Sequence, residues 1–407
     1  MLYPLKHCFI PIVYDMLISK HPLWNAGFRP FFIMAATAGM LLPIAWLGVL
    51  HGIWPAPAAN PVLPEFSAVQ WHAHEMFFGF GSAVLIGFLL TASKNWVGIA
   101  GYHGSSLIAL SLAWCLERVS MAFGTNWPPL FFWLCNLGFV VLAVSMLLYT
   151  LLKHRAQDSY RNDNIFFLVA LPLLLPAKLL LLFPESFAHG VTLTQSIFRL
   201  AFLLMLERTI GTFMKNALQL EIRRQPMVDR AIKAMALLLC LSPWLPEALV
   251  STVEMLTTAL LLWRLGGWHL MKAMSRLDIG IMYLGYLALT AQLLLSAVLR
   301  MTDWPMIGAL SLHLFTLGCM GCIAPAMFIR IANGHTGRRI VFGLVEKTIL
   351  WLMILALVSR TLMPQLLPVL YMRWLDITAS AWAIAFGLWL WRFSRQLLSP
   401  RADGKAG

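Results

Sequence analysis

The run WHAHEMFFGFG, residues 71–81, places His72 and His74 two positions apart and next to Glu75. Imidazole and carboxylate groups bind metals and move protons. In a helix the two rings point roughly 200° apart, so one metal ion binds both only if the chain is extended there. Otherwise they serve two different partners. The glycines that follow either let another helix pack closely or leave room for a planar cofactor, and an interfacial histidine pair beside a close helix crossing is the simpler alternative.

A third histidine, His313, lies eight residues beyond Pro305 in an apolar stretch. At helical rise this is roughly 12 Å below the outer end of that stretch. An imidazole at such a depth needs a hydrogen-bond partner or a metal. We therefore expect one outer centre that uses His72, His74 and His313, with a hydrogen-bonded core histidine as the alternative at position 313.

His335 follows His313 by 22 residues, roughly 33 Å along a helix, so the two cannot share a metal. Chemistry at His335 therefore belongs to a separate, inner site. The run HPLWNAGFRPFF, residues 21–32, is expected on the same side, so that His21 could face His335. In the alternative, both runs are helix-terminal turns whose arginines bind lipid phosphates.

Another apolar stretch carries Arg199, Glu207 and Arg208. The guanidinium fork suits the fixed carboxylates of a bound cofactor, because it binds them in a bidentate manner. It equally suits an internal salt bridge to Glu117 or Glu207. Five of the six cysteines lie in apolar runs, and we interpret them, including the pair Cys319 and Cys322, as small buried hydrophobes.

The elements that must position these side chains follow from the composition. The chain has 407 residues, 60% hydrophobic and only 12% charged, against roughly half and a quarter in soluble domains. Apolar runs of around twenty residues, the length that crosses a bilayer, recur from end to end. The sequence therefore predicts a membrane protein and excludes soluble domains, disorder, a disulfide scaffold and a coiled coil.

We expect an all-α polytopic membrane domain at 28–393, between cytoplasmic segments at 1–27 and 394–407. Twelve stretches are long enough to span a bilayer. They lie near 28–50, 73–96, 105–123, 128–152, 164–183, 193–211, 231–250, 252–271, 278–299, 305–332, 348–364 and 372–393.

The Lys and Arg residues predict the orientation of these stretches. With cytoplasmic termini, the inner loops and nearby helix ends hold 24 of the 30 basic residues, as the positive-inside rule requires. The net charge of +13 therefore reflects the orientation of the chain in the membrane and predicts contacts with anionic lipid. Nucleic acid as a partner needs no separate hypothesis. The six remaining basic residues are Arg118, Lys178, Arg199, Arg300, Arg360 and Arg373.

These runs together resemble the NnrS family of haem- and copper-containing membrane proteins linked to nitric-oxide metabolism. The matching motifs are spaced across nearly the whole chain in family order. They are His21-Pro22-Leu23 with Gly27 to Phe32, Trp71 to Met76, Gly87 to Ala92 with Asn95-Trp96, Arg208 with Phe213 and Asn216, Leu284-Gly285-Tyr286, Leu312-His313 through Gly318, and Gly334-His335-Thr336-Gly337-Arg338.

The resemblance implies a twelve-helix fold in the bacterial cytoplasmic (inner) membrane, haem b with copper, and protection of the cell from nitric oxide. Carried over to this chain, it implies haem or metal ligands at His72, His74, His313 and His335, and also at His21. Tyr283 stands where the family often has a histidine before Leu-Gly-Tyr, which bears on one cofactor site.

Nitric oxide is small and apolar, so it concentrates in the hydrocarbon core, where an open haem or copper position between helices would meet it. Imidazole suits both metals. We expect the outer centre described above and a second haem near His335, and reduction of nitric oxide would need protons, with Glu75 as the nearest relay, as well as a respiratory electron donor. The arginines expected to bind cofactor carboxylates are Arg29, Arg199, Arg208 and Arg338.

Two other classes of protein fit the same pattern. A secondary transporter would also carry buried Arg, Glu and His in a bundle of twelve spans, but it would bind no haem and would take up a substrate into vesicles. An accessory or assembly subunit of a respiratory complex would co-purify with partner subunits. A nitric-oxide sink or sensor would carry the same ligands as an enzyme.

Overall fold

A computed structural model describes residues 19–55, 62–63, 66–302 and 304–405 of the chain. Residues 1–18, most of the expected N-terminal segment, lie outside the described residues. Helices account for the regular structure. In chain order they are η1 (Pro22–Asn25), α2 (Phe28–Leu50), α3 (Ala68–His74), η2 (Glu75–Gly81), α4 (Ser82–Val97), α5 (Ser105–Phe123), η3 (Gly124–Asn126), α6 (Pro129–Lys153), η4 (Arg155–Gln157), α7 (Arg161–Ala170), α8 (Leu174–Leu182), η5 (Pro184–Ser186) and α9 (Phe187–Leu218).

The second half of the chain continues in the same way. Its helices are α10 (Pro226–Leu238), η6 (Leu239–Trp244), α11 (Glu247–Gly266), α12 (Leu270–Met274), α13 (Leu277–Met301), α14 (Leu310–His313), η7 (Leu314–Gly321), α15 (Cys322–His335), α16 (Leu344–Thr361), α17 (Met363–Leu366), η8 (Pro368–Leu370) and α18 (Tyr371–Leu397).

A continuous or briefly interrupted helix lies in each of the twelve expected stretches. Among the described residues, nine helices are long and apolar enough to cross a membrane, so the expected all-α membrane fold is confirmed. The other three stretches contain α9, α10 with η6, and α18, of which α9 and α18 carry several charged side chains and α10 is short. The number of twelve crossings stays a prediction.

One expected boundary was wrong. The apolar pattern put the break between the seventh and eighth stretches near residue 251, but η6 ends at Trp244 and α11 begins at Glu247. Pro246 is the N-cap of α11, and a proline ring fits a helix start because it has no N–H to leave unpaired. Proline therefore determined this boundary, although the hydropathy of the chain continues across it.

Two helices through the middle of the bundle contain π-helical segments. η2 follows His74 directly and joins α3 to α4, and η7 follows His313 directly and joins α14 to α15. The most apolar windows of these two helices are 89% and 78% buried. Because π-helical turns are rare and occur frequently at functional sites, both expected histidine runs are distinguished by their backbone conformation.

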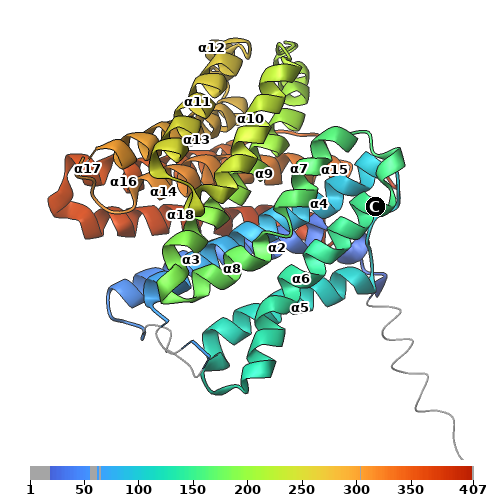
Figure 1. Ribbon diagram of the computed structural model, residues 1–407. Helices are drawn as coiled ribbons and strands as arrows, with labels where there is room; N and C mark the ends of the chain where they lie inside the picture. Colours follow the sequence, from blue (N-terminus) through green and yellow to red (C-terminus); the bar gives the residue numbers. More distant parts are fainter. Residues whose placement is uncertain (1–18, 56–61, 64–65, 303, 406–407) are drawn as a thin grey trace, which may run out of the picture.

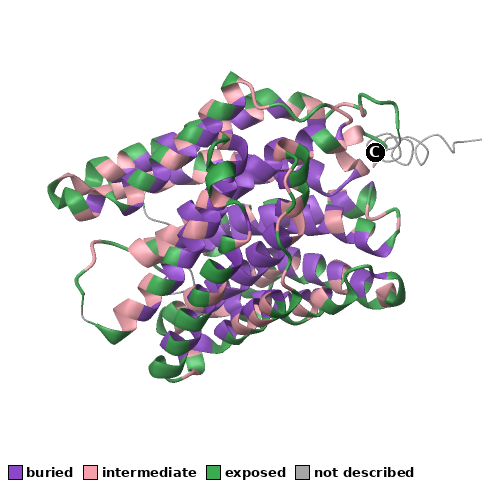
Figure 2. Ribbon diagram, turned by 90° about the horizontal axis from the view of Figure 1, so that it is seen from above, coloured by how far each residue is buried: buried purple, intermediate pink, exposed green. Residues whose placement is uncertain are grey.

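The remaining helices surround this centre (Figure 1). α18 packs along α2 and α16, α5 pairs with α6 at one edge, and α10, α11 and α12 form the opposite edge. Buried residues concentrate along the middle of the bundle and exposed ones on its outer helices (Figure 2). Exposed large apolar side chains such as Leu130, Trp263 and Leu344 cover the outside, as expected for a protein in lipid.

The glycines of the central helices serve close packing. A Cβ at Gly81 would lie 3.0 Å from Met320 Cε, and one at Gly87 would lie 2.7 Å from Phe31 Cβ. Of the two sequence-based interpretations, close helix crossing is therefore the one that the structure shows at these positions, because side chains of neighbouring helices already fill the space.

Candidate functional site

His72 and His313 line one cavity of about 620 Å³ between the two central helices, at the end of the bundle away from the start of α2 and the end of α18. Most of its lining is apolar, with side chains such as Phe80, Leu317 and Met320. Ligand pockets in proteins have this size and this mainly apolar lining with few polar groups. The polar side chains in the lining, apart from two tryptophans, are His72, Thr192, His313, Thr316, Arg360, Tyr371 and Thr378.

The hydrogen bonding of His313 defines its tautomer. Its Nδ1 lies 2.8 Å from the carbonyl oxygen of Ala309. A carbonyl oxygen only accepts, so Nδ1 carries the proton and Nε2 of the neutral ring keeps its lone pair. A backbone carbonyl on the other nitrogen is the usual arrangement around a metal-binding histidine. His313 is thus available as a ligand through Nε2.

His72 is held by packing. Its ring stacks on Trp46 of α2 with centroids 4.5 Å apart and planes 19° apart. Among the described residues its nitrogens make no hydrogen bond or ion pair. The stacking fixes the plane of the ring while both nitrogen atoms stay without a protein partner, so His72 is also available to a ligand in the cavity.

His74 lies on the other side of the same helix and does not line the cavity. Its ring is completely buried, with Nδ1 3.0 Å from Glu75 Oε1 and Nε2 3.7 Å from Glu117 Oε1. The helical geometry thus sends the two histidines to different partners, as the 200° separation requires. The expected centre of three histidines is not what the structure shows, because the cavity joins only His72 and His313.

Glu75 belongs to the same buried group as His74. Arg118 Nη1 donates to Glu75 Oε2 over 2.8 Å, and Arg118 Nη2 contacts Glu117. Lys178 Nζ lies 2.6 Å from Glu117 Oε1. We call His74, Glu75, Glu117, Arg118 and Lys178 the ionic cluster; its two carboxylates balance its two cations, which buried charges require.

Gly79 makes room for the ionic cluster. A Cβ at this position would lie 2.5 Å from Arg118 Nη1 and 3.4 Å from Glu75 Oε2. Trp114 Nε1 also donates to the Gly79 carbonyl over 3.1 Å. The π-helical turn therefore brings bare backbone against α5, and its glycine packs against charged groups rather than against a cofactor.

Among the described residues no group of three or more His, Cys, Asp or Glu side chains could hold a metal ion by itself. Among the described residues a metal in the cavity would therefore have at most two imidazole ligands, His72 and His313, and its remaining positions would be open or filled by another group. Such an incomplete set is typical of haem and of catalytic metal sites, which keep positions for other ligands.

The second expected site lies at the opposite end of the bundle. The His335 ring at the end of α15 is 5.4 Å from the Phe28 ring. Arg29 is buried and donates through Nη1 to the carbonyls of Leu397 and Ser399, while its Nε and Nη2 have no partner among the described residues. The charges of Arg401 and Arg338 both act on Arg29. Positively charged side chains therefore lie close together at this end of the bundle, as expected.

His21 has a local role at the start of η1. Its Nδ1 accepts from the backbone N–H of Leu23 over 3.2 Å and caps η1. Residues of the C-terminal tail instead contact the His335 turn, since Arg401 donates to the His335 carbonyl over 2.9 Å. The hydrogen bond from Arg401 also lowers the pKa of Asp403 to about 2.

Arg199 and Arg208 lie apart from the His72 and His313 cavity, and the three guanidinium nitrogens of Arg208 are buried without a hydrogen-bond partner among the described residues. Arg199 interacts electrostatically with Glu254 of α11, and the Arg208 guanidinium lies 4.4 Å from the Trp96 ring centroid and 4.5 Å from that of Tyr160. Neither forms the expected salt bridge to Glu117 or Glu207 within the part of the chain that the structure describes. Glu207 pairs with Lys233 and Arg264.

Tyr283 lies apart from the cavity. Its hydroxyl donates to the Trp268 carbonyl over 2.6 Å. The substitution of Tyr for a family histidine therefore leaves the His72 and His313 side of the molecule untouched. Cys319 and Cys322 are buried free thiols, in line with their interpretation as packing residues.

Sequence reasoning missed the cavity residue Arg360 and gave no role to Tyr371. Arg360 was visible as one of six basic residues on the outer side, but nothing local connected it with histidines in distant helices. It likewise missed Arg118 and Lys178 as partners of His74 and Glu75. Their signal was the same: a charged side chain inside an apolar stretch, where charges are costly and need a partner.

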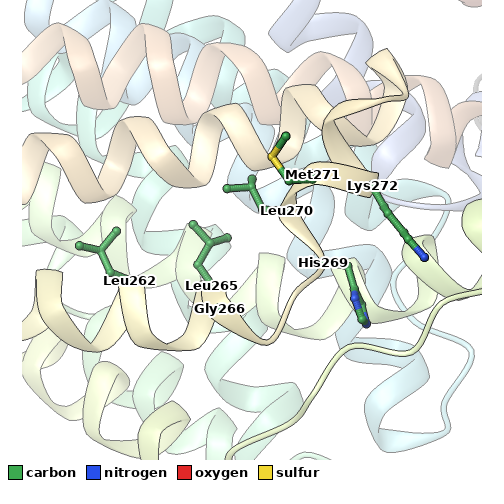
Figure 3. A pocket seen from close by; sticks show the side chains of 7 residues that line it. All are labelled: Leu262, Leu265, Gly266, His269, Leu270, Met271 and Lys272. Atoms are coloured by element: carbon green, nitrogen blue, oxygen red, sulfur yellow. The ribbon is translucent and has the colours of Figure 1, made fainter.

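A second hollow, of about 450 Å³, lies at the turn between α11 and α12 (Figure 3). Its lining is Leu262, Leu265, Gly266, His269, Leu270, Met271 and Lys272. His269 Nε2 is engaged with the Glu221 carbonyl at 3.1 Å. This hollow holds neither a second histidine nor an acidic side chain, so the cavity between the central helices is the better candidate site.

The fold and the site define an all-helical integral membrane protein with a histidine-lined cavity between two π-bulged central helices. Residues 22–401, nearly the whole chain, match the family described as NnrS protein. The chain belongs to the NnrS family. Comparison with curated proteins gives no match.

Proposed function

We propose that the protein is a haem- and copper-containing membrane protein that acts in nitric-oxide metabolism or tolerance, by binding and converting nitric oxide at a centre in the helix bundle. The observation that carries this proposal is the pairing of His72 and His313 in one apolar cavity, with free nitrogen atoms on both rings. Membership of the NnrS family supports it, since the resemblance to that family implies haem and copper. We place the protein in the bacterial cytoplasmic membrane with both termini in the cytoplasm.

The residues of the cavity fit the proposed cofactors. Two neutral imidazoles are suitable ligands for haem iron and for copper, and the apolar lining admits a planar organic group as well as a small neutral gas. Bound there, iron or copper with an open position would supply the site at which nitric oxide binds. The cavity-lining Phe80 and Met320 would exclude water from that site.

A second haem near His335 remains part of the proposal. Support comes from the cations around that turn, Arg29, Lys94, Arg338 and Arg401, because haem carboxylates need such partners. We leave His74 out of the outer centre because carboxylates surround its ring. We also leave out His21, which caps η1, and Arg199, which interacts with Glu254. Arg208 keeps its proposed role in binding a cofactor carboxylate, because its Nε, Nη1 and Nη2 are buried without a hydrogen-bond partner among the described residues.

Glu75 retains its proposed role as a proton relay. Its hydrogen-bonded neighbour is His74, and a carboxylate beside an imidazole can pass a proton from one to the other. Replacing Glu75 by Gln removes the exchangeable carboxyl, and it also removes the charge that faces Arg118. Glu117→Gln, which unbalances the ionic cluster in the same way, is therefore the matched control. We expect slower consumption of nitric oxide in Glu75→Gln than in Glu117→Gln, measured on folded protein with a nitric-oxide electrode and a reductant.

The test of the cofactor proposal is a visible absorption spectrum of the purified protein, oxidised and reduced, with and without nitric oxide, together with iron and copper analysis. We expect a Soret band that shifts with nitric oxide. His313→Ala and His72→Ala should each lose part of the band or of the copper. The matched control is His103→Ala, because His103 is exposed in a loop.

A colourless protein without iron or copper, purified from haem-replete cells, would refute the proposal. Vesicle uptake assays would then test the secondary transporter, and co-purification the accessory subunit. Full metal content in His313→Ala would remove that residue from the ligand set while leaving the rest of the proposal in place.

A further inference from the structure

Among the described residues that line the His72 and His313 cavity, Arg360 alone carries a formal charge at neutral pH. It lies in the last turn of α16. Among the described residues its guanidinium forms no ion pair and no hydrogen bond; it packs 5.6 Å from the ring of Tyr371. The described lining of the cavity therefore contains a positive charge and no carboxylate.

Several arginines in the apolar helices have a carboxylate partner. Arg118 pairs with Glu75 at 2.8 Å, Arg264 with Asp229 at 3.2 Å and Arg330 with Asp278 at 2.8 Å. Charges at membrane depth need compensation, since lipid cannot solvate them. Among the described residues Arg360, like Arg29, Arg199 and Arg208, has no such partner, and of these four Arg360 is the one that lines the cavity.

The Tyr371 hydroxyl is a further hydrogen-bond donor beside Arg360, and the Trp382 indole is another donor elsewhere in the cavity lining. A Cβ at Gly308 would lie 2.7 Å from the Tyr371 hydroxyl oxygen and 3.4 Å from Arg360 Nη1, so both groups meet above this residue. Gly308 has a positive φ of 66°, which favours glycine at this turn. Trp382 is 3% exposed, lines the same cavity, and its indole N–H has no acceptor.

Arg360 also acts electrostatically on both His72 and His313. A negative group beside Arg360 would therefore lie near the two imidazoles and would offset the positive charge of Arg360 that acts on both rings. Arginine binds carboxylates and other oxyanions through paired N–H groups. The cavity thus offers an apolar body, two imidazoles and one anion-binding end.

We propose that Arg360 and the Tyr371 hydroxyl form an oxyanion-binding subsite in the histidine-lined cavity. This inference rests on the proposed function, because it assigns the anionic part of whatever that cavity holds. Two sources share the chemistry: the propionate of a bound haem, or a small inorganic oxyanion such as nitrite. In both, Arg360 orients the ligand, and its negative end lies at the Arg360 side of the cavity.

The first arm of the test compares haem with its dimethyl ester, which has no free carboxylate. Detergent-purified apo-protein is titrated with each, and binding is followed by the Soret band. With a propionate in the subsite, the wild type should prefer the diacid by at least tenfold. Arg360→Gln should bind acid and ester equally, and Arg360→Lys should keep part of the preference.

The second arm titrates the same proteins with nitrite by calorimetry. A free-anion subsite predicts nitrite binding to the wild type, loss of at least tenfold in affinity in Arg360→Gln, and a smaller loss in Tyr371→Phe. The control is Arg373→Gln, two residues beyond Tyr371 on the exposed face of α18. Size-exclusion profiles in detergent exclude misfolding as a cause.

The outcomes separate this inference from the proposed function. If haem binds and Arg360→Gln changes neither the preference for the acid nor the binding of nitrite, the subsite is refuted and the cofactor proposal stands. If nitrite binding depends on Arg360 but neither porphyrin binds, the subsite stands and the haem proposal fails. Absence of all binding to the folded wild type would refute both.

Discussion

Two positions of one helix, His72 and His74, lie in opposite surroundings. His72 stacks on Trp46 at the edge of a cavity and has no hydrogen-bond partner among the described residues. His74 is buried in the ionic cluster, between two carboxylates that two cations neutralise. The same residue type thus serves an open site on one face and a closed structural network on the other.

The difference shows how to recognise a ligand among buried polar groups. The ionic cluster connects α3, η2, α5 and α8 through paired opposite charges, although His74 Nε2, Glu117 Oε2 and Arg118 Nε have no hydrogen-bond partner among the described residues. The cavity instead has a positive charge with no carboxylate partner at Arg360, and imidazole lone pairs at His72 and His313 that no described residue uses. The cavity, rather than the charge-balanced ionic cluster, is therefore the region expected to bind something from outside the chain.

Breaking the ionic cluster should give the largest effect on stability. Glu117 contacts Arg118 and Lys178 at the same time, so Glu117→Gln leaves two buried cations with one carboxylate between them. We expect a loss of roughly 3–5 kcal/mol in unfolding free energy, because an unpaired buried charge is costly. Thermal unfolding in detergent, followed by tryptophan fluorescence, measures it.

The control for this change is Glu185→Gln, since Glu185 is exposed in η5 and should unfold like the wild type. An unfolding temperature of Glu117→Gln equal to that of the control would show that the ionic cluster does not stabilise the bundle, and the comparison drawn above would lose its basis.

Crowding the ionic cluster should have the next largest effect. Gly79→Ala places a methyl group 2.5 Å from Arg118 Nη1, so the guanidinium or the helix must move. We expect a loss of roughly 1–3 kcal/mol, as for other overpacked sites, from the same unfolding measurement.

Gly138→Ala is its matched control, because a Cβ at this helical position has nothing within 4 Å. Alanine forms helices better than glycine, so this variant should gain up to about 1 kcal/mol. Equal effects of the two substitutions would contradict the close packing of Gly79 against α5.

Replacing each of the two histidines by alanine separates an effect on protein stability from an effect on cofactor binding. His74→Ala should cost about 1–3 kcal/mol, since it leaves carboxylate oxygens of the ionic cluster without a partner, and it should keep the haem or copper signal. His72→Ala should cost less, about 0.5–1.5 kcal/mol for the lost ring stacking, and should reduce that signal. Unfolding temperature and metal content are measured on the same preparations, and loss of metal in His74→Ala alone would reverse our assignment.

The smallest expected effect concerns the ion pair between Arg401 and Asp403, which lies in water and so contrasts with the buried ionic cluster. The hydrogen bond from Arg401 lowers the pKa of Asp403 from 3.8 to about 2. This carboxylate therefore stabilises the docked tail fully above about pH 4, and the contribution is lost as the pH falls toward 2. Hydrogen exchange of the Ala402 amide, which donates to Thr336, should rise over this interval after correction for the intrinsic rate.

Asp403→Asn should show the faster exchange of Ala402 already at pH 6, with an unchanged unfolding temperature of the whole protein, because exposed ion pairs contribute little. Exchange that is insensitive both to the substitution and to pH would mean that backbone hydrogen bonds alone hold the tail against the His335 turn.

The sequence by itself determined the helices and their approximate bounds. Apolar stretches near bilayer length predict helices in lipid, because every backbone polar group must find its partner within the segment. It also determined that His72 and His74 point apart and that His313 and His335 cannot share a metal, because helical rise and rotation are local properties. Proline at 246 shows the limit of this reasoning, since hydropathy alone misplaced that boundary.

Only the tertiary structure decided which side chains meet. His72 with His313 and Arg360, His74 with Glu117 and Lys178, and Arg208 with Trp96 join helices far apart in the chain. Such contacts depend on how each helix is rotated and shifted against its neighbours, which steric packing over the whole bundle determines. A charged residue in an apolar stretch therefore predicts that a partner exists, but the packing of the helices determines which residue that partner is.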